Sequence, residues 1–122
     1  MLLYVIIAVI IIALIVKLST VQDENTKLLS EKCRNDTYEE YKRKSTKSLN
    51  HELHEIAEEY HKRLDYYIKE YKEQYGSECM TQFGYNEEKL INGGESFMRH
   101  NKNDMKLYYR YNVICEILDK RK

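Results

Sequence analysis

The sequence predicts an all-α protein with an N-terminal transmembrane helix, a long amphipathic helix and a small helical C-terminal cap. The first sixteen residues carry no charged side chain, and twelve of them are Leu, Ile or Val. The 122 residues include no Pro, which suits long helices because Pro costs about 3 kcal/mol in a helix interior. Apolar residues recur every three or four positions from Leu49 to Tyr71, as they do on one face of a helix.

Residues 1–18 are predicted to be an uncleaved signal anchor that crosses the membrane once. The twelve aliphatic residues supply about −4 to −7 kcal/mol of insertion free energy. Lys17 can turn its ammonium outward and let Leu18 extend the span. Apolar residues on every face argue against a buried core helix. No basic side chain precedes Tyr4, and no small residue stands at a cleavage position, so a cleaved signal peptide is disfavoured.

Residues 19–35 are expected to form a stalk, and residues 36–76 a long, coiled-coil-like amphipathic helix. Asp36 and Glu39 are spaced as in a capping box, in which each side chain accepts from a backbone N–H at the helix start. Several acid–base pairs four residues apart support a helix beyond this point. Gly76 is a plausible C-terminal stop.

One narrow apolar stripe runs along the long helix, and it is the predicted partner-binding surface. Two arrangements fit it: a parallel coiled coil with a second copy, or a monomeric hairpin onto which the C-terminal segment folds. The residues of the stripe are Leu49, Leu53, Ile56, Tyr60, Leu64, Tyr67 and Tyr71.

Residues 77–122 are expected to form a cap of short helices. Asn86 is placed to cap a short helix that Gly93 and Gly94 would end. The segment 105–118 fits both a helical stripe and a strand alternation. Helix is preferred, because no second convincing strand exists to satisfy the backbone of a lone strand.

The three cysteines predict one disulfide and one cross-link. Cys79 and Cys115 lie in the thin-cored cap, where a bridge would contribute about 4 kcal/mol in the loop-entropy model. Cys33, in the stalk, is available for an intermolecular bridge. The alternative is three reduced thiols in a protein that faces the cytosol.

A polar face of the long helix carries the residues for an alternative metal or haem site. Imidazole and carboxylate groups at such spacings can bind zinc or copper, although a solvated helix face is the simpler interpretation. The candidates are His51, His54, Glu58 and His61, with Glu55 beside them. No phosphate-binding glycine loop or nucleophile turn is present, so we expect no enzyme and no cofactor.

Charge limits the partners and leaves the topology open. Twenty basic and twenty acidic residues cancel, which disfavours nucleic acid as a partner. Basic residues follow the anchor and favour a cytoplasmic domain by the positive-inside rule. The expected disulfide favours an oxidising compartment, and we expect the C-terminal domain on the extracytoplasmic side. The expected partners are the lipid bilayer and another protein or a second copy of this chain.

These features predict a non-enzymatic, single-pass membrane protein that acts through protein–protein interaction. An anchor, a helical outer domain and a few cysteines are similar in layout to the small single-span proteins that phages and other viruses place in envelopes, such as inner-membrane spanins and lysis regulators. The similarity implies an envelope or lysis-associated role, and because it is one of layout alone, it assigns no functional residue. A metal- or haem-binding membrane protein and an accessory subunit of a membrane complex are the alternatives.

Overall fold

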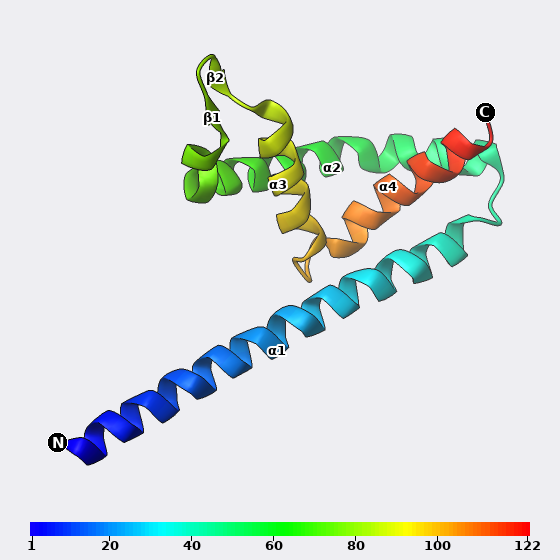
Figure 1. Ribbon diagram of the computed structural model, residues 1–122. Helices are drawn as coiled ribbons and strands as arrows, with labels where there is room; N and C mark the ends of the chain where they lie inside the picture. The colour runs from blue at the N-terminus through cyan, green and yellow to red at the C-terminus, as the bar shows by residue number, and fades with distance from the viewer.

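The computed structural model describes residues 1–18 and 24–122. In this part of the chain, helices dominate, and the all-α prediction is confirmed (Figure 1). The elements in order are α1 (Leu2–Tyr41), α2 (Thr46–Tyr75), the 3-10 helix η1 (Gly76–Cys79), β1 (Met80–Thr81), β2 (Gly84–Tyr85), α3 (Glu87–Arg99) and α4 (Met105–Lys120). None of the helices, taken over residues 1–18 and 24–122, has both the length and the apolar character needed to cross a membrane.

The break between the first two helices lies ten residues later than predicted. The predicted stalk falls partly on residues 19–23, outside the described residues, and its remainder from Glu24 is helical. Asp36 therefore lies within α1 and caps nothing. The chain reverses at Lys42–Ser45 instead, and the Ser45 side chain accepts from the Ser48 backbone N–H to begin α2. Helix α1 continues past Asp36 because Thr37 and Tyr41 are buried, at 0 % and 2 % exposure.

Helix α2 lies at the centre of the folded part, and its apolar stripe packs into a hydrophobic core formed by this chain alone. Its contacts are with α3 and α4, and α4 lies between α1 and α2 (Figure 1). Leu53 and Tyr71 are half-buried, and the other five stripe residues are buried. The hairpin alternative describes this arrangement, because the surface assigned to a partner or a second copy is covered by α3 and α4. The core cluster is Tyr41, Leu49, Ile56, Tyr60, Leu64, Tyr67, Met98, Met105, Tyr108, Tyr109, Val113, Ile114 and Ile117.

The predicted C-terminal end of α2 and the predicted start of α3 are confirmed, but the predicted end of α3 is wrong. Gly76 is the C-cap of α2, and Asn86 caps α3 by accepting from the Lys89 backbone N–H. Helix α3 continues through Gly93 and Gly94 to Arg99. The two glycines permit a close crossing, since a Cβ at Gly93 would lie 2.4 Å from the Tyr71 ring. At Gly94 it would lie 2.9 Å from the Ile68 backbone.

The segment 105–118 is helical, as preferred, and forms most of α4. The only strands in the described residues are the short antiparallel pair β1–β2, which the sequence did not predict. Helix α1 is tied to the C-terminal end of α3 and to the N-terminal part of α4 through Ser30, which is 2 % exposed. Its hydroxyl donates to the Arg99 carbonyl at 3.0 Å and lies 2.5 Å from the Tyr109 hydroxyl.

Candidate functional site

A polar junction joins α1, α2 and α4 at the closed end of the helical hairpin. The Tyr41 hydroxyl donates to Glu52 Oε1 at 2.5 Å, and Arg110 Nη2 donates to the same oxygen at 2.8 Å. Arg110 Nε also donates to the Tyr41 oxygen at 3.0 Å, while Lys44 Nζ lies 3.4 Å from Glu52 Oε2. One carboxylate thus gathers donors from two helices and from the α1–α2 connection.

The environment of this junction moves the pKa values of its groups away from neutrality. Burial, followed by the hydrogen bond to Glu52, raises the pKa of Tyr41 to about 12. Burial opposes ionisation of Glu52, yet the hydrogen bonds from Tyr41 and Arg110 lower its pKa below 4.5. A general acid or base at pH 7 needs a pKa near the working pH. The hydrogen bonds of this junction tie α1, α2 and α4 together.

A second junction connects the start of α4 to the middle of α2. Asp104 immediately precedes α4, but its side chain makes no cap hydrogen bond. Its carboxylate accepts instead from Arg63 Nη2 at 2.7 Å and from the Tyr67 hydroxyl at 2.5 Å. Burial and the bond to Asp104 raise the pKa of Tyr67 to about 12, and despite its own burial the pKa of Asp104 is lowered by Arg63 and Tyr67. This junction also holds helices together.

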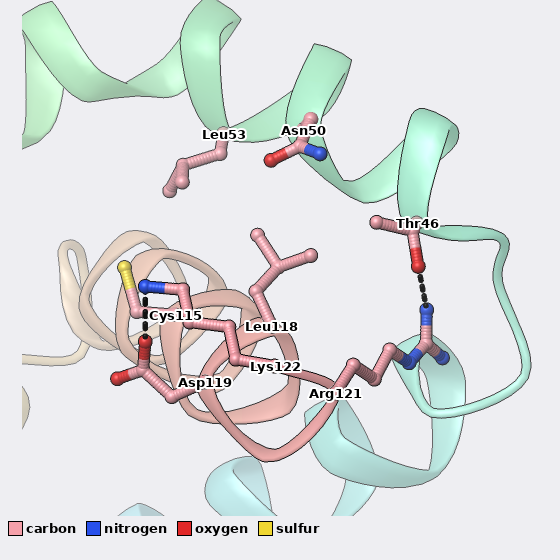
Figure 2. A pocket seen from close by; sticks show the side chains of 8 residues that line it. All are labelled: Thr46, Asn50, Leu53, Cys115, Leu118, Asp119, Arg121 and Lys122. Carbon is pink, nitrogen blue, oxygen red and sulfur yellow. Dashed lines mark hydrogen bonds and ion pairs between the residues drawn. The ribbon is translucent and has the colours of Figure 1, made fainter.

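A hollow of about 450 Å³ lies between the N-terminal part of α2 and the C-terminal end of α4. Leu53 and Leu118 extend toward each other across it, with Cys115 beside them (Figure 2). Arg121 closes one side by donating to the Thr46 hydroxyl at 3.1 Å and to the Lys42 carbonyl at 3.1 Å. Burial, followed by the charge of Asp119, raises the pKa of the Cys115 thiol. That thiol is a weak nucleophile at neutral pH, because the thiolate is the reactive form.

The structure does not form the predicted Cys79–Cys115 disulfide, and Cys33 is also a free thiol. Cys115 lines the hollow beside Leu53, whereas Cys79 lines a second hollow beside Tyr71. Those two α2 residues are eighteen positions apart, which is about 27 Å along a helix. A disulfide needs Cα atoms within about 7 Å. The prediction overlooked that the two cysteines pack against opposite ends of α2.

The candidate metal-binding residues on α2 do not converge. His51 pairs with Glu55 at 3.0 Å, and both are exposed. His61 Nε2 lies 3.3 Å from the Tyr111 hydroxyl, and its ring packs edge-on against Tyr60 and Tyr111. No three His, Cys, Asp or Glu side chains come together as metal ligands within the described residues. The geometry of His51, His54, Glu58 and His61 therefore gives the metal or haem alternative no support.

Sequence reasoning missed the residues of the polar junction between α1, α2 and α4. Tyr41, Glu52 and Arg110 come from three helices, and Arg110 is 58 residues from Glu52 in the chain. No local spacing marks such a pair. A local signal did exist for the start of α2, since Ser45 is a preferred N-cap residue type and accepts from the Ser48 backbone N–H.

Comparison with family models, with curated proteins and with solved structures finds no match for this chain.

Proposed function

We propose that this chain is a non-enzymatic, membrane-anchored interaction protein. Residues 1–18 would lie in the bilayer, and residues 24–122, the helical head, would be displayed at its surface. The observation that carries the proposal is the contrast in exposure along the chain. Each large apolar side chain from Met1 to Leu18 is at least 45 % exposed, whereas Leu49, Met98 and Ile114 in the head are fully buried.

The exposed run needs a partner that surrounds it. Contiguous apolar surface on this scale marks an interaction with protein or membrane. Because the apolar side chains cover every face of the helix, a bilayer satisfies them all at once. As a helix, residues 2–18 are about 26 Å long, somewhat less than a hydrocarbon core of about 30 Å. Local thinning and an outward-turned Lys17 ammonium can accommodate such a difference.

The head supports an interaction role because it closes on itself. All four α-helices contribute to its core cluster, so this core is covered without another subunit. This disfavours the accessory subunit whose soluble part folds only in a complex. The Leu49–Tyr71 stripe is part of this core, so a partner protein or a second copy would meet the outer surface of the head.

One sequence argument remains for deciding which side of the membrane the head occupies. Extracytoplasmic placement depended on a Cys79–Cys115 bridge, and both thiols are free. The basic residues that follow the anchor favour the cytoplasmic side. An impermeant maleimide added to intact cells tests this, because thiols on the cytoplasmic side react only after the membrane is broken.

Flotation of the full chain with phosphatidylcholine vesicles, followed by alkaline carbonate extraction, tests the anchor. Ile7→Asp combined with Ile11→Asp places two charges in the run and costs about 6 to 8 kcal/mol, comparable to the whole insertion free energy. We expect the wild type to float and resist extraction, and the double variant to stay in the soluble fraction. Leu28→Asp is the control, since Leu28 is 62 % exposed and lies outside the run. Flotation of the double variant equal to that of the wild type would contradict the proposal.

A further inference from the structure

We infer that the β1–β2 hairpin is a second membrane contact, with Phe83 inserted into the interface of a zwitterionic bilayer beside the anchor. This inference rests on the proposed function. It starts from an unusual surface: Phe83 at the tip is 95 % exposed, and Met80 and Tyr85 in the strands are 54 % and 42 % exposed. Large apolar side chains at the tip of a loop have no role in the core.

The composition of the hairpin is suited to a lipid interface. A third of the chain is charged, yet the eight residues between Glu78 and Glu87 carry no charge. Aromatic side chains concentrate at the level of the lipid headgroups, where one end can be apolar and the other wet. Acidic and basic residues both flank the hairpin, so the contact would depend on apolar and aromatic insertion and would not require anionic lipid.

Hydrogen bonds within the hairpin hold the backbone of Phe83 at its tip. The Thr81 hydroxyl donates to the Gly84 carbonyl at 2.6 Å, and the Phe83 backbone N–H donates to the Thr81 hydroxyl oxygen at 3.3 Å. Gly84 has a φ of 117°, which favours glycine and lets the turn close. Lys72 Nζ lies 4.2 Å from the centre of the Tyr85 ring and attaches the hairpin to α2. A preformed loop loses little conformational entropy when its tip inserts.

The fold returns the C-terminal end of α2 toward the N-terminal side of the molecule, and the hairpin lies there across α2 and α3 from α1 (Figure 1). The chain reverses at Lys42–Ser45, and α2 runs back toward the side on which the N-terminus lies (Figure 1). Helix α2 has 30 residues, about 45 Å, whereas the described part of α1 after residue 23 has 18 residues, about 27 Å. Because α2 is longer than this part of α1, the two helices can be inclined by up to about 50°. The C-terminal end of α2 then still reaches the level of Glu24 along the α1 axis.

The hairpin is also displaced sideways from α1. Helix α3 connects them, with its first residue following the hairpin and its last residue bonded to Ser30 of α1. Its 13 residues span about 20 Å. An anchor and a second contact displaced sideways from it would fix the tilt of the head against the bilayer, which an anchor alone leaves free.

Single tryptophans in the full chain test this contact, because the sequence contains no Trp. Phe83→Trp reports on the hairpin and Tyr4→Trp on the anchor. Arg43→Trp reports on the exposed α1–α2 connection at the opposite end of the head. Each variant is placed in phosphatidylcholine vesicles with and without lipids brominated near the glycerol end of the acyl chain. Unchanged circular dichroism confirms that each variant folds.

The inference expects bromine to quench Phe83→Trp and Tyr4→Trp and to leave Arg43→Trp unaffected. Quenching of Tyr4→Trp alone would overturn the hairpin contact and leave the membrane anchor standing. Absence of quenching in all three would overturn the anchor, and the hairpin contact with it. If Phe83→Trp were shielded from iodide but not quenched by bromine, a protein surface would cover the hairpin, and the lipid contact would be wrong.

Discussion

Arg110 Nη2 of α4 lies 2.8 Å from Glu52 Oε1 of α2, and the Glu52 carboxylate also accepts from Tyr41 of α1. Together, the three side chains fix α1, α2 and α4 relative to one another at the end of the head farthest from the N-terminus. The Glu52 side chain is 17 % exposed and that of Arg110 is 32 % exposed, so solvent screens the pair only in part. The junction is therefore worth more than an ion pair on an open surface.

Glu52→Gln is expected to destabilise the head. The amide keeps the size of the side chain but removes the charge, which leaves Arg110 and Tyr41 with a weaker acceptor. Loss of a charged hydrogen-bond partner at a partly buried site costs about 1–3 kcal/mol. Urea unfolding of the full chain in detergent, followed by circular dichroism, measures the change.

Glu55→Gln is the matched control on the same helix. Glu55 is 61 % exposed and pairs only with the exposed His51 among the described ion pairs. A surface pair of this kind contributes little, and the control should unfold within about 0.5 kcal/mol of the wild type. Equal stability of Glu52→Gln and Glu55→Gln would show that the junction does not hold the helices together.

Gly94→Ala should weaken the crossing of α2 and α3. The added Cβ would lie 2.5 Å from Ile68 Cγ1 and 2.9 Å from the Ile68 backbone, and the backbone cannot give way without moving α2. Overpacking of this kind costs about 1–3 kcal/mol and outweighs the gain of about 1 kcal/mol in helix propensity. The midpoint of thermal unfolding should therefore fall.

Gly76→Ala separates this crowding from a general effect of replacing glycine. Its Cβ would approach the flexible Lys72 side chain at 3.3 Å and no backbone atom within 4 Å. We expect a change of less than about 1 kcal/mol. A Gly94→Ala protein as stable as Gly76→Ala would mean that α2 and α3 are farther apart than in this structure.

Local signals fixed the helical class and several of the helix ends correctly. Asn86 and Gly76 act through hydrogen bonds within a few residues, so their roles can be predicted from the sequence. The capping-box spacing of Asp36 and Glu39 predicted a helix start that the structure does not have. Ser45 is the actual start, because a continuous α1 buries Thr37 and Tyr41 against side chains of α4 that lie 69 residues away.

Contacts between residues far apart in the sequence explain why the helix crossing and the polar junctions were harder to predict. The Gly93–Gly94 pair reads as a helix end, and only the approach of α2 shows that it serves close packing. Asp104 stands at a local N-cap position before α4, but its carboxylate bonds to Arg63, 41 residues away. The stripe from Leu49 to Tyr71 was correctly identified as an apolar face, and the sequence left open whether its own chain or another would cover it.

The free cysteines give a prediction about covalent state. Alkylation of the denatured chain without reductant should add three groups by intact mass, because Cys79 and Cys115 pack at opposite ends of α2. In the folded protein, Cys79 should react most slowly, since it is 2 % exposed and the other two are half-buried. A single alkylation before reduction and three after it would restore the disulfide and contradict the arrangement of α2 and α4.

The free energy of unfolding should decrease at both acidic and alkaline pH. Glu52 and Asp104 have lowered pKa values in the folded head, so their contribution is complete above their ordinary values of 4.5 and 3.8. It is lost as the pH falls through the folded-state values, because the unfolded chain takes up protons more readily. Below about pH 4.5 the free energy of unfolding should fall, and less steeply in Glu52→Gln than in Glu55→Gln.

The alkaline limb comes from buried tyrosines. Burial is the largest cause that raises the pKa of Tyr41, Tyr60 and Tyr67 from 10.0 to about 12. A raised folded-state pKa gives stability that is complete below pH 10 and is lost as the pH rises toward 12, because the unfolded chain releases these protons first. Unfolding free energies measured from pH 9 to 12 should decline, and Tyr67→Phe should decline less because one titrating group is gone. A flat profile over this range would mean that the three hydroxyls reach solvent and that the core around α2 is open.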